Sequence, residues 1–482
     1  MPEKKKLVEP RTLKGFQDYL PEDVIARRQV VRTIEEVFEK YGFVPLETPA
    51  LEYLDVVLGT GGEDVNKELF RLESPEGEDI SLRFDLTVPF ARLLAQYPDK
   101  LKVPVRRYAI GPVWRADKPG PGRFRQFTQI DADIAGSASV AVDGEIIAIM
   151  VEIMRALGAP SYRVLVNNRK LIDALLDDCG IHEEERQKHV LRVIDKLAKV
   201  GLDNIRLELG PGRVDDSGDP IPGARLDDET IDKILNFIGV KGTSRAEVVD
   251  NLRELLPDTD LARLALDEMR EFAEVLEALG VDEEHAWFDP SLARGLDYYT
   301  GPVYETVIPD IKKLGSVMGG GRYNGLVGRF LDREIPATGM SVGLDRLMAA
   351  LKKLKVLDEI KSTVQVLVVS LGEIPSSETL RIAAELRDAG LRTEAYFGKK
   401  MRMKDQLSHA DRHGIPVAVI LGEDELARGE ISVKDLLSGK AGKEHIDDRD
   451  EYRRAGKDTQ VTVKRSELVA TVQRYLADSE SA

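Results

Sequence analysis

The sequence is poor in cysteine and has no long apolar run. Its 482 residues include one cysteine, Cys179, so the chain can form no internal disulfide. No segment approaches the roughly 20 consecutive apolar residues that a membrane-spanning helix requires. The basic, polar start MPEKKKLVEP is followed by no apolar stretch, so it does not resemble a signal peptide. We therefore expect a cytoplasmic protein that does not associate with membranes.

Histidine is also scarce, and the usual nucleotide-binding motifs are missing. The six histidines and the single cysteine show no zinc-ligand spacing, so we expect no zinc. The absence of G-x-x-x-x-G-K-[ST] excludes a P-loop. The segment GGGRYNG, residues 319–325, lacks the spaced glycines of a dinucleotide-binding motif. Any bound ATP must therefore be held by a different arrangement.

Composition and charge indicate a folded protein of several domains. Hydrophobic residues make up 42% and charged residues 32%, and the length predicts roughly three folding units. The net charge of −16 argues against a generally basic, nucleic-acid-binding surface. Residues 364–482, however, hold 19 basic and 21 acidic residues. This C-terminal region is the less repulsive surface for a polyanion.

The order of local patterns predicts mixed α/β organisation. Apolar residues at helical spacing predict a helix over Glu22–Tyr41, and two prolines place the following segment at a sheet edge or interface. Two antiparallel strands joined by a polar loop are expected between Val105 and Gly136. Strand and helix alternate after Val364, which predicts a separate small α/β domain with a parallel core. The boundaries that we predict are 1–169, a helical insertion at 170–284, 285–355, and 364–482.

Three arginines stand beside strand or loop patterns: Arg115, Arg294 and Arg346. Guanidinium groups match phosphate oxygens in pairs and stay charged at neutral pH, so three that converge would suit a triphosphate. A single arginine in such a position is more often a surface or ion-paired residue. Spacing alone leaves both interpretations open.

Five segments occur in the order found in one known family. They are SLRFDLTVPFARLLA, RRYAIGPVWRADKPGPGRFRQFTQIDADIAG, LARGLDYYTGPVYE, MGGGRYNGLVGRF and ATGMSVGLDRL. With them the chain resembles histidyl-tRNA synthetases, a family of class II aminoacyl-tRNA synthetases, over nearly its whole length and least between about 170 and 284. The resemblance implies an α/β fold with an α+β catalytic core, in which an antiparallel sheet is flanked by helices. It makes 1–169 and 285–355 the two parts of this core and 364–482 an anticodon-binding domain.

The resemblance also implies an ATP site. Arg115 would bind the α-phosphate, and Arg346 would pack on the adenine and reach the γ-phosphate. Arg123 would lie in a loop over the nucleotide. Arg294 would stabilise charge at the α-phosphate while the substrate carboxylate attacks it. ATP would bind with Mg²⁺, and no metal would be held by the protein alone.

A histidine site is implied in the same way. The α-amino group would contact Asp85, Thr87 and Gln129. Asp133 and Tyr299 would read the imidazole, since an acid and a phenol can hydrogen-bond both ring nitrogens. Tyr323 would line the same pocket.

The implied activity is the ATP-dependent activation of L-histidine and its transfer to histidine tRNA. Arg402 and Lys404 would lie near the tRNA. The proline-interrupted segment after the first helix corresponds to a dimer element of the family, so we expect a homodimer.

Two other classes of function are weighed against this one. A noncatalytic synthetase-like regulatory subunit of ATP phosphoribosyltransferase binds histidine on the same catalytic-domain fold. Such subunits generally lack the anticodon domain and lose catalytic motif residues, whereas this chain keeps Arg115, Arg294, Arg346 and a C-terminal domain. A pure tRNA-binding adaptor would leave the combination of pocket and ATP residues unexplained. The sequence favours the ligase.

Overall fold

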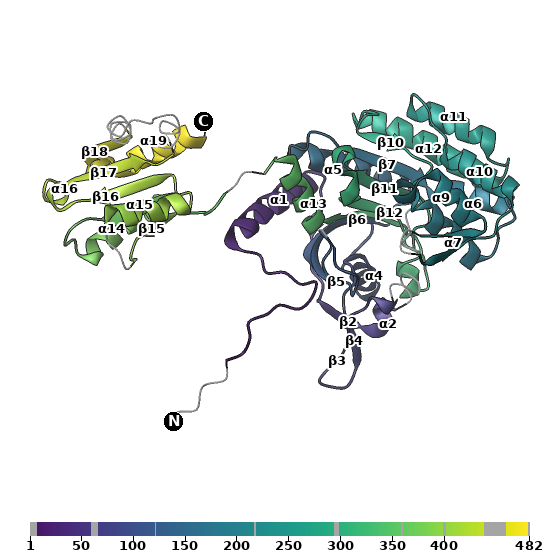
Figure 1. Cartoon of the computed structure of the whole chain (residues 1–482), viewed down its shortest axis with the longest axis horizontal. Helices are drawn as coiled ribbons and strands as arrows, with labels where there is room; N and C mark the ends of the chain where they lie inside the picture. Colours follow the sequence, from purple (N-terminus) through teal and green to yellow (C-terminus); the bar gives the residue numbers. More distant parts are fainter. Residues whose placement is uncertain are drawn as a thin grey trace. The chain divides into compact units, whose positions relative to one another are not determined.

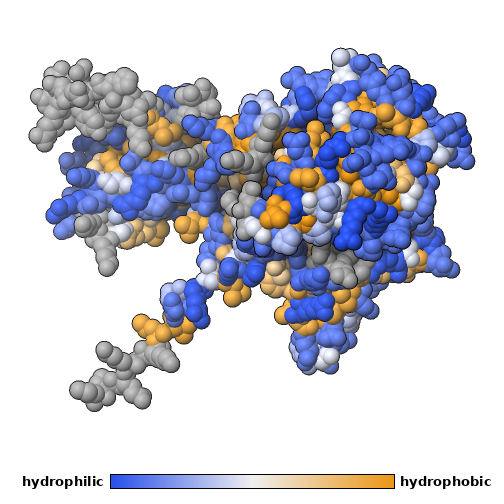
Figure 2. Space-filling view, turned by 45° about the vertical axis from the view of Figure 1, so that its right-hand side comes forward, coloured by the Kyte–Doolittle hydropathy of each residue, from blue (hydrophilic) through white to orange (hydrophobic). Residues whose placement is uncertain are grey.

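The computed structural model describes residues 7–58, 66–120, 122–215, 218–293, 298–357, 360–398, 402–437 and 459–480. It divides the chain into two compact units (Figure 1). The first contains Met1–Asp18 and Gln29–Leu357, and the second contains Tyr19–Arg28 and Asp358–Ala482. None of the helices in these described ranges is long and apolar enough to cross a membrane. On the face shown in Figure 2, hydrophilic side chains predominate and hydrophobic ones form separate patches.

The elements up to residue 357 form the first unit, except that helix α1 begins within the second. The helices are α1 (Pro21–Lys40), α2 (Leu54–Val57), α4 (Thr87–Gln96), α5 (Val140–Ala156), α6 (Arg169–Asp178), α7 (Glu184–Ile194), α8 (Leu197–Val200), α9 (Leu202–Leu209), α10 (Asp228–Ile238), α11 (Arg245–Leu255), α12 (Asp260–Ala278), α13 (Leu344–Leu354) and the 3-10 helices η1 (Pro309–Leu314) and η2 (Val327–Arg329). The strands are β1 (Val44–Pro45), β2 (Leu51–Tyr53), β3 (Arg71–Glu73), β4 (Asp79–Leu82), β5 (Val105–Trp114), β6 (Gln126–Ala135), β7 (Arg163–Asn168), β8 (Gly212–Val214), β9 (Pro220–Pro222), β10 (Ala286–Phe288), β11 (Pro302–Val307), β12 (Met318–Arg322) and β13 (Ala337–Gly343).

An eight-stranded sheet is the centre of this unit. Its strand order is β1-β5-β6-β13-β12-β11-β7-β10, and all neighbours are antiparallel except the pairs β1–β5 and β10–β7 at the two edges. The predicted antiparallel sheet flanked by helices is thereby confirmed. β1, which contains Pro45, lies at an edge, where a missing backbone N–H is tolerated.

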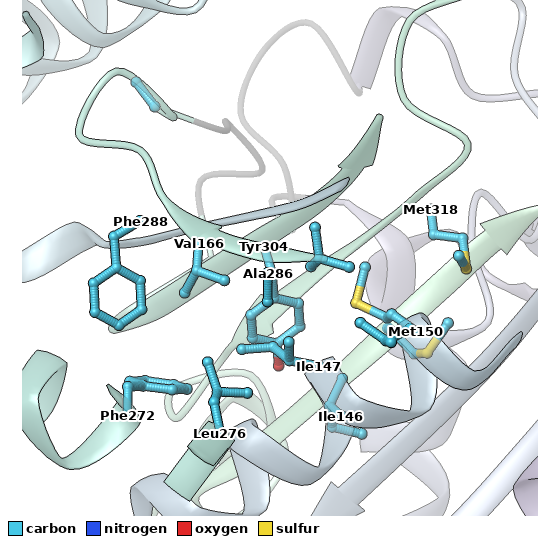
Figure 3. Packing of buried hydrophobic residues seen from close by; sticks show 14 of the residues in the cluster. Ile146, Ile147, Met150, Val166, Phe272, Leu276, Ala286, Phe288, Tyr304 and Met318 are labelled. Atoms are coloured by element: carbon cyan, nitrogen blue, oxygen red, sulfur yellow. The ribbon is translucent and has the colours of Figure 1, made fainter. Parts of the chain in front are cut away.

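One face of the sheet is closed by α5 and α12 (Figure 3). Ile146, Ile147 and Met150 lie at helical spacing on α5, and Phe272 and Leu276 point toward them from α12. All five side chains are fully or almost fully buried. This apolar contact fixes the sheet from one side and leaves its other face for polar groups.

Residues 170–284 are mostly helical, as predicted, and hold the short β8–β9 hairpin. Helices α6–α12 lie near the β7–β10 end of the sheet (Figure 1). Their apolar residues belong to the same core cluster as those of the sheet. Glu208 is fully buried among them and forms ion pairs with Lys196 at 2.9 Å and Arg213 at 2.8 Å. A buried carboxylate with two cations is stabilised where an unpaired one would not be.

The second unit contains a five-stranded sheet of order β15-β14-β16-β17-β18. Its elements are β14 (Val366–Ser370), α14 (Ser376–Asp388), β15 (Thr393–Ala395), α15 (Met403–Arg412), β16 (Val417–Leu421), α16 (Glu423–Ala427), β17 (Glu430–Asp435), β18 (Gln460–Lys464), η3 (Arg465–Glu467) and α19 (Leu468–Glu480). β14 pairs in parallel with β15 and β16, which confirms the predicted parallel core. The antiparallel strands β17 and β18 and the last helix were not predicted.

Candidate active site

A cavity of about 650 Å³ in the first unit brings together most of the predicted site residues. Nine of them line it: Asp85, Thr87, Arg115, Arg123, Gln129, Asp133, Tyr299, Tyr323 and Arg346. Arg294 lies outside the described residues. Arg402 and Lys404 belong to the other unit. Residues from five separate stretches of sequence thus meet around one space.

Strand β6 separates the cavity from the apolar core. Ile130 and Ile134 belong to the core cluster that contains α5. Gln129, Asp131 and Asp133 alternate with them and therefore project from the opposite face of the strand. This period-two pattern places three polar side chains in a row beneath the cavity.

Asp133 is buried and held by two partners. Its Oδ2 lies 2.7 Å from the Arg107 Nη2, and the Tyr323 hydroxyl donates to its Oδ1. Burial raises the pKa of Asp133, whereas Arg107 and the hydrogen bond from Tyr323 lower it. Arg107 is itself fully buried and also donates to the Leu86 carbonyl at 2.9 Å. The carboxylate is therefore fixed in position before any substrate enters.

Glycines of the neighbouring strands make room for these side chains. A Cβ on Gly339 would lie 2.0 Å from the Asp133 Oδ1, and one on Gly321 would lie 2.8 Å from the Tyr299 ring. Real Cβ atoms do not approach other atoms so closely. Gly339 on β13 therefore leaves room for the Asp133 carboxyl, and Gly321 of the glycine-rich motif leaves room for the Tyr299 ring.

Arg322 ties the segment that contains Tyr299 to the rest of the sheet. Its guanidinium pairs with buried Asp143, with an Nε to Oδ2 distance of 3.0 Å, and donates to the Ser137 carbonyl at 2.9 Å. Its own carbonyl accepts from the Thr300 N–H at 2.8 Å. The residue after Tyr299 is thus bonded to a strongly anchored strand.

Asp85 lies at the beginning of α4. Its Oδ1 accepts from the backbone N–H groups of Thr87 at 3.1 Å and Val88 at 2.9 Å. Burial raises the pKa of Asp85, while these hydrogen bonds and Arg115 lower it. A carboxylate at the N-terminal end of a helix is favoured by the exposed N–H groups there, which explains why the strand-turn-helix pattern places Asp85 in the cavity wall.

The predicted phosphate-binding arginines are held by backbone and aromatic groups. Arg115 donates from Nε to the Phe84 carbonyl at 3.2 Å, and its guanidinium carbon lies 4.2 Å from the centre of the Phe84 ring. Burial lowers the pKa of Arg115, and Asp85 raises it. Arg346 donates from Nη1 to the Ser316 carbonyl at 2.9 Å. Arg123 pairs with Asp117 in the loop between β5 and β6.

The site and both halves of the fold correspond to known protein families. The family model for histidyl-tRNA synthetase matches residues 15–347, and the model for the anticodon binding domain matches residues 365–475. The chain belongs to the histidyl-tRNA synthetase family. It is 41% identical to the histidine–tRNA ligase of Paracoccus denitrificans, over 96% of this chain and 97% of the relative. The ligase of Ruegeria pomeroyi is also 41% identical, over 99% of each chain.

Solved structures agree with this family membership. The crystal structure of histidyl-tRNA synthetase from Nostoc sp. PCC 7120 has a TM-score of 0.79 and 32% sequence identity, and it covers 97% of this chain and 100% of that one. A Bacillus halodurans protein described as an ATP phosphoribosyltransferase regulatory subunit/histidyl-tRNA synthetase has a TM-score of 0.69 at 24% identity, over 84% of this chain and 97% of its own. That second likeness concerns the fold alone.

Some residues that line the cavity of this histidyl-tRNA synthetase family member were not predicted from the sequence. Asp195 and Lys199 come from the helical region, and Glu305 and Asp345 come from the later part of the sheet unit. The described residues contain no group of three or more His, Cys, Asp or Glu side chains that could hold a metal ion. Asp131, which lies beneath the cavity, could have been found from the sequence, because it shares the period-two pattern of Gln129 and Asp133.

Proposed function

We propose that this protein is a histidine–tRNA ligase. It activates L-histidine with ATP to form histidyl-adenylate and pyrophosphate, and then transfers the histidyl group to the 3′ end of histidine tRNA with release of AMP. The observation that carries the proposal is the single cavity lined by the nine residues named above. It offers carboxylates and phenols together with guanidinium groups, which suits an amino acid beside a triphosphate.

The histidine contacts divide into two groups. Asp85, Thr87 and Gln129 surround the α-ammonium group, which donates hydrogen bonds that an ionised carboxylate and an amide oxygen can accept. Asp133 and Tyr299 bind the imidazole nitrogens, and Tyr323 holds Asp133 in place. Buried polar groups left without partners would penalise any side chain that lacks the ring nitrogens. The site therefore selects histidine over apolar amino acids of similar size.

The ATP contacts are cationic. Arg115 binds the α-phosphate, Arg346 the adenine and γ-phosphate, and Arg123 covers the nucleotide, while Arg294 stabilises charge at the α-phosphorus. The histidine carboxylate attacks that phosphorus directly, so no general base is required, and positioning and charge stabilisation lower the barrier.

Class II synthetases use ATP with Mg²⁺. Glu305 and Asp345 line the cavity, and one or two carboxylates with phosphate oxygens make a suitable Mg²⁺ ligand set. Bound Mg²⁺ would neutralise phosphate charge.

The decisive experiment is amino-acid-dependent exchange of labelled pyrophosphate into ATP. Histidine and a panel of other amino acids are compared on the full-length protein. We expect exchange with histidine alone. Binding of histidine without exchange would instead favour the regulatory subunit of ATP phosphoribosyltransferase, and exchange with another amino acid would overturn the pocket assignment.

For the tRNA we propose contacts on the second unit. Arg402 and Lys404 are exposed at the beginning of α15, where basic side chains and helix N–H groups favour phosphate oxygens. The four-part division of the chain and a cytoplasmic location remain predictions with this proposal.

We also propose a homodimer. Val44 and Tyr53 are each 55% exposed on β1 and β2, and Leu51 is 46% exposed. Exposed apolar side chains beside an unpaired strand edge favour association with a second copy. Sedimentation at micromolar concentration should show a dimer, and a monomer alone would contradict it.

A further inference from the structure

Asp131 is a buried carboxyl directly beneath the cavity. It is 1% exposed, and its cross-strand partner on β13 is Ser341. In the same register Gln129 pairs with Gly343 and Asp133 with Gly339. Side chains that are directly or diagonally opposite on one face of a sheet lie within reach of each other. Neither Asp131 nor Ser341 was given a role above.

The hydrogen bonds around Ser341 have a defined direction. The Gln129 Nε2 donates to the Ser341 Oγ at 2.8 Å. Because this oxygen acts as the acceptor, the hydroxyl proton of Ser341 is left to donate elsewhere. The Asp131 carboxyl stands on the neighbouring strand, where burial raises its pKa and the nearby Ser341 hydroxyl lowers it. Neither Asp131 oxygen has a hydrogen-bond partner of good geometry among the described residues, so the carboxyl is available to accept a hydrogen bond from Ser341.

The same arrangement leaves one atom of Gln129 unused. Its Oε1 is buried and has no hydrogen-bond partner among the residues that the structure describes. Gln129 lines the cavity, so this oxygen is a buried acceptor beside the substrate space. Buried acceptors are rarely left unpaired unless a ligand or water completes them.

We propose that Asp131 and Ser341 position Gln129 so that its Oε1, and not its NH₂ group, faces the α-ammonium of histidine. The inference rests on the proposed function, because it assumes histidine as the ligand. When the Asp131 carboxylate accepts a hydrogen bond from the Ser341 hydroxyl, the Ser341 oxygen remains the acceptor for the Gln129 NH₂ group. Without that carboxylate, Ser341 can donate to the Gln129 Oε1 instead. The Gln129 amide then rotates by about half a turn, and its N–H groups face the positively charged α-ammonium of histidine, which they cannot bind.

This role differs from a general contribution of negative charge. Asp85, Asp133, Arg107 and Arg115 also interact electrostatically with this region. Asp131→Ala removes both the charge and the acceptor. Ser341→Ala breaks the chain of hydrogen bonds but keeps the charge of Asp131. Equal behaviour of the two variants therefore identifies the orientation of Gln129 as the cause.

The test measures binding of two ligands by calorimetry at about pH 8, where a carboxyl is largely ionised. The ligands are L-histidine and 3-(imidazol-4-yl)propionate, which lacks the ammonium. We expect Asp131→Ala and Ser341→Ala each to weaken histidine binding by about 10- to 100-fold, the usual range for a hydrogen bond to a charged group. The propionate should bind each variant within about 2-fold of wild type, and KM for ATP should not change. Thr306→Val, which removes another buried hydroxyl of the same sheet, is the control.

The outcomes separate the two proposals. Wild-type affinity for histidine in both variants would overturn the positioning role and leave the ligase function intact. Equal weakening of both ligands would mean that the residues are merely structural, which also overturns it. Failure of the wild-type protein in pyrophosphate exchange with histidine would contradict the ligase function, whereas the positioning role would still be decided by the binding data.

Discussion

The two main sheets of this protein use their faces differently. In the second unit, β14 and β16 are buried along their whole length, and their alternate residues enter two apolar clusters on opposite faces. In the first unit, β6 sends Ile130 and Ile134 to an apolar core but Gln129, Asp131 and Asp133 to the opposite face, where the cavity lies. A strand covered on both sides reads as a continuous apolar run, whereas a strand with a site on one face alternates.

This difference between the two sheets indicates that the first sheet carries the functional site, whereas the second contributes mainly to stability. Both units have a packed core, but the largest concentration of buried charge, Asp85, Arg107, Asp131, Asp133 and Arg322, is on or beside the first sheet. Such groups are costly to bury, so their presence marks a site and not a core. Changes in the first sheet should therefore affect activity, and changes in the second should affect stability.

The largest effect is expected from Gly321→Ala. The new methyl group would meet the Pro302 carbonyl oxygen at 2.7 Å and the Tyr299 ring at 2.8 Å. A displacement of about 1 Å in a site of this kind lowers activity on the order of 100-fold. We expect that loss in histidine-dependent exchange. Gly325→Ala, in the same motif but with open space around its Cβ, is the control. Similar activity of the two variants would mean that the close approach is unimportant.

A converse result is expected from Val368→Ala in the second sheet. This side chain is fully buried with Val366 and Val419. The deletion should lower the free energy of unfolding by about 2 kcal/mol, from lost burial and the remaining cavity. Denaturant titration measures this, and histidine-dependent exchange at low temperature should stay normal. Leu380→Ala on α14, whose side chain is 45% exposed, should cost much less. Loss of histidine-dependent pyrophosphate exchange in a folded Val368→Ala protein would contradict the assignment of the second sheet to stability alone.

The pH dependence of stability sharpens the contrast further. Burial raises the pKa of Asp131 from 3.8 to about 7, so ionising this group costs folding free energy as pH rises between those values. Wild type should therefore lose stability relative to Asp131→Asn by roughly 2 kcal/mol between about pH 5 and about pH 8. Thermal unfolding of both proteins at the two pH values measures this difference. A constant difference would mean that Asp131 does not titrate in that range.

The smallest effect concerns the surface of the second unit. Lys404→Ala removes one exposed cation from α15, so tRNA affinity should fall only a few-fold, and the slope of log affinity against log salt should decrease by about 0.7 to 0.9. Filter binding over a salt series gives both quantities. Arg381→Ala, which removes an arginine already paired with Glu378, is the matched control. An unchanged slope for Lys404→Ala would remove this residue from the interface.

Much of the fold was predictable because its patterns are local. The β5–β6 hairpin carries long alternating strands on either side of a loop rich in glycine and proline, and β14, β15 and β16 alternate with amphipathic helices. β17 and β18 escaped prediction because they contain charged residues, such as Lys434 and Lys464. Period and turn signals are weak in such segments.

The site was predicted residue by residue from family motifs, but its internal contacts were not. Tyr323 was expected to line the pocket, yet nothing in the sequence placed its hydroxyl on Asp133. Likewise, no local pattern encodes the register that sets Asp131 opposite Ser341. Contacts between strands that are distant in the chain depend on tertiary packing, which motif spacing does not report.

The pairing of β6 with β13 has a consequence for synthesis of the protein. Asp131 and Ser341 are 210 residues apart in the chain, although they are neighbours in the sheet. A ribosome that adds about 5 to 20 residues per second needs roughly 10 to 40 s to cover that distance. During this interval β6 is already made but lacks the strand that completes the polar floor. During synthesis, Gln129 and Asp133 therefore exist before Ser341 and Tyr323, the residues with which they form hydrogen bonds in the folded protein. We expect chaperones to bind the nascent chain at this stage.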